Sequence, residues 1–199
     1  MNNASSDEIK LLNAARFGDV ATVDSLRKSG VDILSTRSDD GMSSILFASR
    51  NGHIDLLNYL LEHGADPNDE EYYGGTCLMA ASCYRNPDCV RRLIEAGADV
   101  SYKYSGDNAT VIYMTVYVFW KDSEEYDHEN FFEEGSVIRT VKLLLDAGAP
   151  GNTRSTSFDC VVGVGKTALQ VLLGMSVGTG GKIRRERDGL IMLLQDHDD

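Results

Sequence analysis

Residues 41–66 read GMSSILFASRNGHIDLLNYLLEHGAD, and this stretch decides the fold that we predict for the chain. Apolar side chains recur at spacings of three and four residues in both halves of the stretch, which indicates two short amphipathic helices. Asn51 and Gly52 form a turn signal between the halves, and Gly64 stands where a left-handed residue commonly ends a helix. Helices this short are marginal alone in water, so each pair needs neighbours that cover its apolar face.

Copies of this unit run along the chain. The segment that ends the helix pair recurs with its glycine at Gly30, Gly64, Gly97 and Gly148, at intervals of 34, 33 and 51 residues. The segment that opens the pair recurs as GMSSILFAS at 41–49, GGTCLMAAS at 74–82 and GKTALQVLL at 165–173. A period near 33 residues with two helices per unit predicts a stack in which each unit covers the next.

The period and the opening segment resemble the ankyrin repeat, whose consensus opening is Gly-x-Thr-Pro-Leu-His-x-Ala-Ala. The proline and the histidine of that consensus are absent from all three copies. The resemblance is strong over residues 7–103 and is interrupted beyond them. It implies an all-α, ankyrin-type helical-repeat solenoid of about five helix pairs, with hairpin-like fingers between the pairs. We expect one domain over residues 1–199, with repeats at about 7–36, 37–69, 70–102, 103–151 and 152–199.

Insertions distinguish the fourth and fifth repeats. The fourth joins an inner helix at 110–120 to its outer helix through residues 121–135, which carry seven acids and one base. The β-branched residues of the predicted inner helix at 110–120 would suit a strand equally well if that segment were taken alone. Register with the other repeats favours a helix. The fifth repeat has an inner helix at 167–175, a connection at 176–183 followed by basic residues, and a terminal outer helix at 189–194.

The acidic and the basic connection are expected to pack together, because equivalent connections of neighbouring repeats emerge at the same edge of a stack. The acidic candidates are Glu124, Glu125, Glu133 and Glu134, and the basic candidates are Lys182, Arg184 and Arg185. Phe131 and Phe132 would be buried beneath them, because adjacent phenylalanines suit a freely solvated loop poorly. The alternative is that the acidic connection is free and awaits a basic partner surface.

Composition limits the class of protein and the class of partner. Thirty-one acidic and 19 basic residues give a formal net charge of −12, which disfavours nucleic acid because phosphates require Lys and Arg. The charge favours a partner with a basic or polar surface, and it serves solubility equally well. The sequence has no apolar run of about 18 residues, and its four cysteines are too few for a disulfide scaffold. Residues 1–10 are polar and lack the basic and apolar regions of a signal peptide, so we expect no secretory leader. We therefore expect a cytoplasmic monomer without a membrane partner.

Several patches resemble chemical sites and have better explanations. Residues 163–167 resemble the end of a phosphate-binding loop, but Cys160 stands where that loop needs a glycine. The acids around His128 lack the spacing and the central glycine of a calcium loop. His53 and His63 stand at a helix turn and a helix end, where capping is the ordinary role. We therefore predict no cofactor, no metal and no catalytic residue, although catalytic partners can lie far apart in sequence.

The resemblance implies that the chain holds another protein on a concave face made of finger tips and inner helices. Repeat register maps these residues onto that face: Arg16, Phe17, Asp39, Asp40, Met42, Arg50, Asn51, Tyr72, Tyr73, Cys83, Tyr84 and Tyr117. Tyrosine gives a large contact area at little entropic cost, which supports this reading. The alternative is that Tyr117 and one of Tyr72 or Tyr73 cover the next repeat. The predicted function is a non-enzymatic module that holds, and in holding inhibits or scaffolds, one protein. The alternative is an enzyme with a site between residues 121–135 and 176–187.

Overall fold

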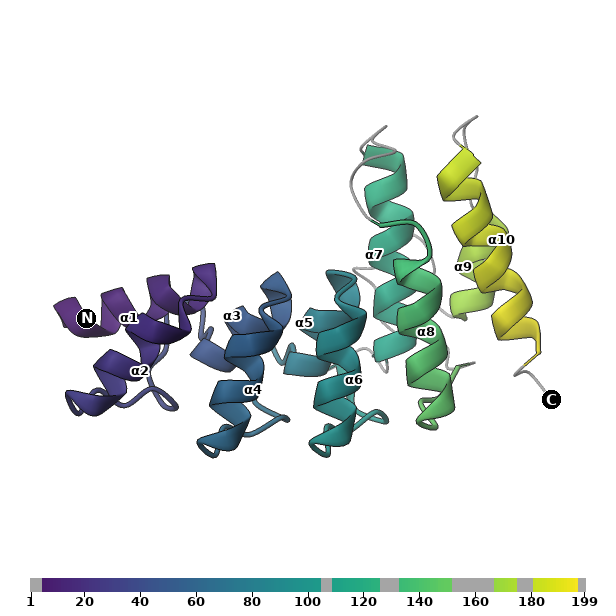
Figure 1. Ribbon diagram of the computed structural model, residues 1–199. Coiled ribbons are helices and arrows are strands. Elements are labelled where there is room, and N and C mark those ends of the chain that lie inside the picture. The colour runs from purple at the N-terminus through teal and green to yellow at the C-terminus, as the bar shows by residue number, and fades with distance from the viewer. Residues whose placement is uncertain (1–4, 105–108, 126–132, 152–166, 175–180, 197–199) are drawn as a thin grey trace. The chain divides into compact units, whose positions relative to one another are not determined.

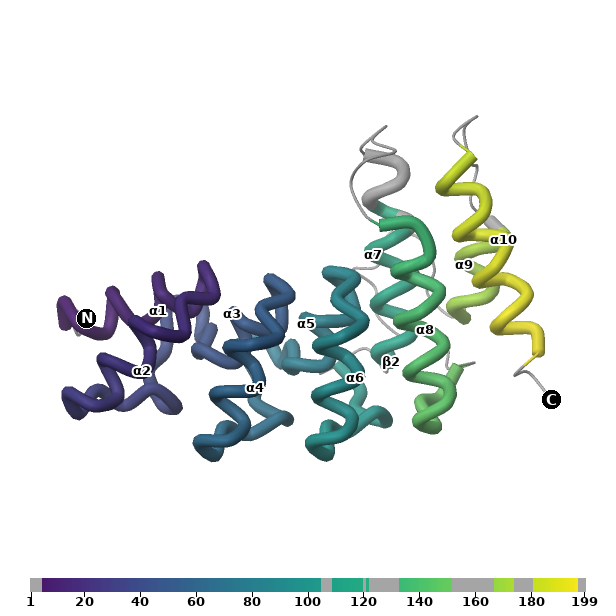
Figure 2. The backbone as a smooth tube through the Cα atoms, viewed as in Figure 1, coloured from purple at the N-terminus to yellow at the C-terminus, as the bar shows by residue number. Residues whose placement is uncertain are grey.

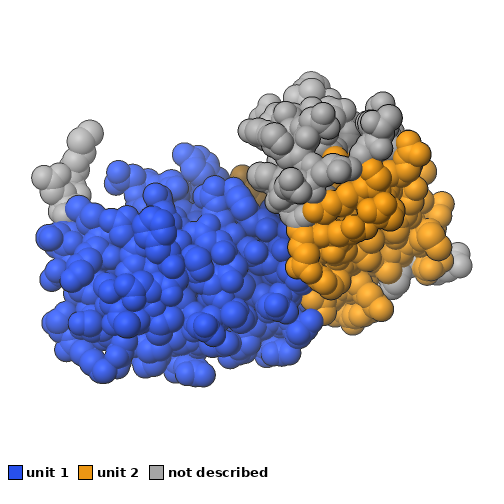
Figure 3. Space-filling model, turned by 45° about the horizontal axis from the view of Figure 1, so that its top comes forward, with its two compact units in different colours: residues 1–98 blue, residues 99–199 orange. Residues whose placement is uncertain are grey.

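The computed structural model describes residues 5–104, 109–125, 133–151, 167–174 and 181–196. Contacts divide the chain into unit 1, residues 1–98, and unit 2, residues 99–199, which Figure 3 colours separately. Ten helices and two strands of two residues each make up the regular structure of the described residues (Figure 1). The chain therefore has the predicted fold class, an all-α helical-repeat solenoid. The proposed repeat boundaries stay a prediction.

Unit 1 consists of three helix pairs in chain order. The inner helices are α1 (Ser6–Phe17), α3 (Ser44–Asn51) and α5 (Cys77–Cys83). The outer helices are α2 (Val20–Lys28), α4 (Ile54–Glu62) and α6 (Pro87–Glu95). Each outer helix packs against its own inner helix, and α3 packs against both α1 and α5, as the tube in Figure 2 shows. The core between the two layers is apolar, and its fully buried members include Leu11, Leu46, Leu56, Leu57, Leu60 and Leu93.

Hydroxyl side chains fix the start of four inner helices. The hydroxyl oxygen of the residue before the helix accepts a hydrogen bond from the backbone amide three residues later, at 3.3–3.4 Å, in Ser43, Thr76, Thr110 and Thr167. Serine and threonine are preferred there because they satisfy an amide that the helix itself leaves without an acceptor. The third residue of the repeated opening segment is therefore an N-cap, and it fixes the start of the helix although the following proline of the consensus is absent.

The turn inside the second helix pair is tied to the first pair. His53 Nε2 donates a hydrogen bond to the backbone carbonyl oxygen of Arg16 at 2.8 Å. Gly18, at a φ of 72°, leaves room for the ring, because a Cβ there would lie 2.7 Å from it. His53 therefore bonds the neighbouring pair and makes no side-chain cap of its own helix, which corrects the sequence-based prediction. The ring of His63 does bond a carbonyl at its helix end, that of Tyr59, at 2.8 Å.

The next turn repeats this arrangement one unit later. Asn86 Nδ2 donates hydrogen bonds to the backbone carbonyl oxygens of Ser49 at 3.1 Å and Arg50 at 2.8 Å. A Cβ on Gly52 would lie 2.7 Å from Asn86 Oδ1, so this glycine also permits a close approach between consecutive pairs. Equivalent turns thus join the second helix pair of unit 1 to the first, and the third to the second.

Unit 2 begins with a short hairpin and continues with four helices. Strand β1 (Lys103–Tyr104) pairs antiparallel with β2 (Ala109–Thr110), which confirms one hairpin-like finger. The helices are α7 (Val111–Glu125), α8 (Ser136–Asp146), α9 (Ala168–Gly174) and α10 (Gly181–Gln195). Helices α7 and α10 each pack against both α8 and α9.

Two helices of unit 2 are longer than predicted. Helix α7 confirms that the β-branched stretch is helical, but it runs through Glu125, so the start of the predicted acidic connection belongs to the helix. Helix α10 begins at Gly181 and passes through Gly189, where the sequence had suggested a helix start. A Cβ on Gly189 would lie 2.5 Å from Ile138 Cδ1, so this glycine serves the close packing of α10 on α8. The basic residues expected in a connection therefore lie on α10.

Candidate protein-binding surface

Most residues predicted for partner binding are accessible on unit 1. The exposed ones are Arg16, Phe17, Asp39, Asp40, Asn51, Tyr72, Tyr73 and Tyr84, and the half-buried ones are Arg50 and Cys83. The exposed fraction is 76% for Phe17, 70% for Tyr72 and 69% for Tyr73. Exposed aromatic groups gathered on one part of a surface are a signature of interaction sites.

Met42 and Tyr117 differ from this group. Met42 is 5% exposed, so the prediction that it lies on an accessible face is wrong. Ser38 holds the backbone of Met42 in a tight turn, because its hydroxyl accepts from the Met42 amide at 3.0 Å and its amide donates to the Met42 carbonyl at 3.0 Å. Tyr117 belongs to α7 of unit 2, is half-buried and stacks on Tyr113 with ring centroids 6.4 Å apart.

Arginine–aromatic pairs cover the ends of the inner helices of unit 1. The guanidinium of Arg16 lies 5.3 Å from the centroid of the Phe47 ring, and that of Arg50 lies 4.6 Å from the centroid of the Tyr84 ring. Arg50 Nη2 also donates to the Tyr84 hydroxyl at 2.5 Å. An aromatic ring attracts a cation over its face, so each pair fixes two long side chains in one arrangement.

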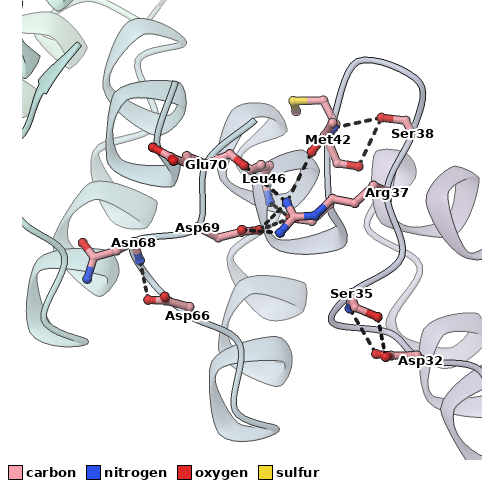
Figure 4. A network of polar contacts seen from close by, with 12 residues as sticks. Asp32, Ser35, Arg37, Ser38, Met42, Leu46, Asp66, Asn68, Asp69 and Glu70 are labelled. Carbon is pink, nitrogen blue, oxygen red and sulfur yellow. Dashed lines mark hydrogen bonds and ion pairs between the residues drawn. The ribbon is translucent and has the colours of Figure 1, made fainter. Parts of the chain in front are cut away.

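Two fingers project between the helix pairs of unit 1: the first finger (residues 29–43) and the second finger (residues 63–76). Arg37 of the first finger reaches Asp69 of the second, as Figure 4 shows, with Nη2–Oδ1 and Nη1–Oδ2 distances of 2.5 and 2.9 Å. The Ser43 hydroxyl donates to the same carboxylate. The side chains are 30% and 14% exposed, and a bidentate pair of this kind holds its partners in a defined geometry. Consecutive fingers are therefore clamped to each other.

The tip of the second finger is shaped so that both of its tyrosines face outward. The Glu71 carboxylate accepts hydrogen bonds from the backbone amides of Tyr73 at 2.8 Å and Gly75 at 2.9 Å. The ring of Tyr72 lies against Gly41 of the first finger, where a Cβ would be 2.7 Å from the ring. Glycine at that position, with a φ of 85°, permits both the turn and the contact. Tyr72 is thus supported from beneath and stays exposed above.

Two carboxylates of the first finger, those of Asp32 and Asp40, are held in the ionised state. The Ser38 hydroxyl donates to Asp40 and holds the pKa of this carboxyl below its usual range, and the nearby charge of Arg50 acts in the same direction. Ser35 lowers the pKa of Asp32 in the same way, by a hydrogen bond from its hydroxyl. Both carboxyls are therefore negative throughout the neutral pH range.

A cavity of about 430 Å³ lies between the fingers and the helices that they connect. Ile45 and Leu60 contribute apolar surface, and Asp32, Arg37 and Asp69 contribute charge. Among the described residues, no group of three or more His, Cys, Asp or Glu side chains is placed to hold a metal ion. In the same part of the chain, no helix combines the length and the apolar character needed to cross a membrane.

In unit 2 the predicted contact between the acidic and the basic segment is confirmed for Glu134 and Arg185. Arg185 Nε lies 2.5 Å from Glu134 Oε1 and lowers the pKa of this carboxyl. Glu133 instead forms an ion pair with Arg139 of α8, at 2.9 Å, and Arg184 is exposed. The predicted burial of Phe131 and Phe132, and the side chains of Glu124 and Glu125, lie outside the described residues.

Glu186 is a structural residue that the sequence analysis missed. Its side chain is fully buried, and its carboxylate accepts hydrogen bonds from the backbone amides of Gly135 and Ile138, the latter at 3.2 Å. The carboxylate from α10 thus caps the start of α8, where Gly135 supplies no side chain. One signal could have found it: Glu186 falls on the apolar stripe that Ile183, Leu190 and Leu194 define at spacings of three and four residues.

Comparison with known proteins gives the following similarities. The sequence model described as ankyrin repeats, in three copies, matches residues 11–104. An ankyrin repeat domain-containing protein of Stachybotrys chartarum, SAT10, is 39% identical over 67 residues, which are 33% of this chain and 4% of that protein. A putative E3 ubiquitin-protein ligase of Arabidopsis thaliana, XBAT31, is 27% identical over 118 residues, which are 59% and 26% of the two chains. The ankyrin repeat and KH domain-containing protein mask-1 of Caenorhabditis elegans is 26% identical over 160 residues, which are 80% and 5%. This chain spans at most about a quarter of these relatives' lengths.

Proposed function

We propose, from the premise that this chain is an ankyrin-repeat protein, that it holds a protein partner on the face that carries Tyr72, Tyr73 and Tyr84. Ankyrin-repeat domains are generally protein-binding modules without catalytic activity of their own. The observation that carries the proposal is the pair of finger tyrosines, which stay 70% and 69% exposed although the backbone beneath them is fixed. We assign no catalytic role to the chain.

The rigidity of this face supports the proposal. The Arg37–Asp69 clamp and the two amide bonds to Glu71 fix the fingers before any partner arrives. Arg50 fixes the ring of Tyr84 in the same way. A surface that is ordered in advance loses less conformational entropy on binding, and exposed aromatic residues concentrate interface energy. The bound partner is inhibited if the contact covers the partner's functional site, and it is scaffolded if that site stays open.

We also propose that the chain acts as a monomer in a reducing, cytoplasmic setting, and the thiol form of its described cysteines agrees with that setting. Cys77, Cys83 and Cys89 are in the thiol form. Burial raises the pKa of Cys89 to about 12 and raises that of Cys77 as well. Both buried thiols therefore stay protonated and act as small core side chains that react little with oxidants or metals.

The experiment is capture of partners from the native source with the purified protein and three variants. Tyr72→Ala, Tyr73→Ala and Tyr84→Ala should each reduce the yield of one stoichiometric protein, while the melting temperature changes little because these side chains are exposed. Met192→Ala is the control, because Met192 is 66% exposed on α10 and belongs to unit 2. If all three tyrosine variants capture the partner like the parent does, the assigned face is wrong.

A further inference from the structure

The negative charge of unit 1 is concentrated in its fingers. Residues 29–43 and 63–76 carry seven carboxylates and a single basic side chain, Arg37, which leaves six unbalanced negative charges. The whole of residues 1–98 has 15 acidic and nine basic side chains, which also leaves six. Outside the fingers, unit 1 is therefore neutral, with eight side chains of each sign. The excess negative charge of unit 1 is therefore carried by the fingers and is not spread evenly over the unit.

The single basic residue of the fingers does not offset the charge at their tips. Arg37 is bound through both of its terminal nitrogens to Asp69, which itself also accepts from Ser43. Asp39 and Asp40, in contrast, are exposed beside Gly41, and Gly41 supports the ring of Tyr72. The finger tips therefore present two exposed carboxylates next to two exposed aromatic rings. Aromatic rings and carboxylates are the two groups that bind guanidinium and ammonium cations best in proteins.

The chain itself contains an example of this recognition. The guanidinium of Arg50 lies over the ring of Tyr84 at 4.6 Å and is close enough to Asp40 for its charge to lower the pKa of that carboxyl. The contact with the Tyr84 ring holds the Arg50 side chain in place on α3. The rings of Tyr72 and Tyr73 lie at the tip of the second finger, and their exposed faces are available to a cation from outside.

We propose that the finger tips of unit 1 bind an arginine- and lysine-rich segment of the partner protein, with its cationic side chains on Tyr72 and Tyr73 and its charge against Asp39 and Asp40. This inference rests on the proposed function and names the chemistry of the partner. The partner supplies positive charge, which excludes a nucleic acid or an anionic membrane as the occupant of this surface. Attraction between the acidic fingers and the basic segment also accelerates the encounter, and this acceleration weakens with added salt.

The test uses fluorescence anisotropy with two short glycine–serine peptides, one that carries several arginines and one that carries glutamates at the same positions. The arginine peptide should bind and the glutamate peptide should not. The double substitution Asp39→Asn with Asp40→Asn should weaken binding about tenfold. The control, Glu62→Gln with Glu95→Gln, removes the same charge from exposed positions at equivalent places in α4 and α6. The control should leave the affinity unchanged, and equal weakening by both double substitutions would overturn the proposal.

The aromatic part of the proposal needs its own pair of variants. Tyr73→Phe keeps a ring face for the cation and should retain the affinity of the arginine peptide. Tyr73→Leu keeps apolar area without the ring and should weaken binding severalfold, and equal affinity for the two variants would overturn the role of the ring. Identical thermal melts of all variants show that the fold is unchanged. A captured protein that depends on the tyrosines but not on Asp39 and Asp40 overturns the charge assignment and leaves the proposed function standing. If the arginine peptide binds but no tyrosine variant alters capture, the proposed function is overturned and the charge assignment stands.

Discussion

Replacing Glu186 by alanine tests the buried carboxylate that joins α10 to the start of α8. The change leaves the part-buried backbone amides of Gly135 and Ile138 without their acceptor. Each unsatisfied buried donor costs about 1–3 kcal/mol. Part of this loss is offset because the variant no longer buries a charge, which is itself unfavourable. We expect a net loss of about 2 kcal/mol of unfolding free energy, at the upper end of the value for a lost N-cap.

The assay is urea unfolding followed by tryptophan fluorescence. Trp120 is the single tryptophan of the chain and belongs to unit 2, so the signal reports on the unit that contains Glu186. Glu134→Ala is the matched control, because Glu134 is a glutamate of the same unit whose ion pair with Arg185 is exposed and should contribute little. If the Glu186 and Glu134 variants unfold at the same urea concentration, the capping role of Glu186 is wrong.

The same residue predicts a pH dependence whose sign can be checked. Burial raises the pKa of the Glu186 carboxyl above its ordinary value of 4.5, and the amides of Gly135 and Ile138 oppose this. The folded protein therefore holds this proton more tightly than the unfolded chain does. The resulting stabilisation is complete below pH 4.5 and is lost as the pH rises through the raised folded value. Glu186→Gln cannot titrate, so the stability of the parent relative to this variant should fall as the pH rises above 4.5. A difference that is constant or that grows with pH contradicts the assignment.

Three further predictions concern unit 1. Arg37→Ala should lower the unfolding free energy by about 1–2 kcal/mol, because it leaves the part-buried carboxylate of Asp69 without its ion-pair partner. The measurement is urea titration, and an unchanged unfolding midpoint contradicts the clamp. Gly64→Val should lower the unfolding free energy by about 1–2 kcal/mol in the same assay, because valine is strained at the φ of 91°. No atom lies within 4 Å of the added Cβ, so backbone strain is the whole cost. A stability equal to that of the parent contradicts this. Cys77 and Cys89 should stay unlabelled by iodoacetamide in the native protein and react after denaturation, read by peptide mass spectrometry, because burial raises the pKa of both thiols; rapid native labelling contradicts their burial.

The sequence predicted those features that depend on local chemistry repeated at a fixed interval. Helix ends at Gly64 and its equivalents follow from backbone conformation, which a glycine reveals without knowledge of the neighbours. The helical state of α7 could be predicted only through register, because its β-branched residues favour a strand locally. Register succeeds here because stacking on neighbouring helices outweighs the weak propensity of single residues.

The features that were missed depend on contacts between distant residues. The start of α10 was placed at Gly189, because a glycine read locally signals a helix end and not close packing on Ile138. Glu186 was passed over because a charged residue is seldom buried, and only the position of α8 explains its burial. Met42 was assigned to the surface because register places its backbone at the finger tip, whereas hydrogen bonds with Ser38 turn it inward. The prediction that Tyr72, Tyr73 and Tyr84 bind a partner awaits the capture experiment.

The turns that tie each helix pair to the one before it make the coupling in unit 1 directional. His53 and Asn86 donate backward, to the carbonyl oxygens of Arg16 and Arg50, so each pair depends on its successor to complete the end of its inner helix. Loss of the third pair would remove the hydrogen-bond donor from the carbonyl oxygens at the end of α3 and open the space beside Gly52. Loss of the first pair would instead release the donors His53 and Asn51 and uncover the face of α3 that packs on α1. Fraying at the two ends of unit 1 should therefore differ in kind, because loss of the last pair leaves backbone acceptors unpaired and loss of the first pair leaves side-chain donors unpaired.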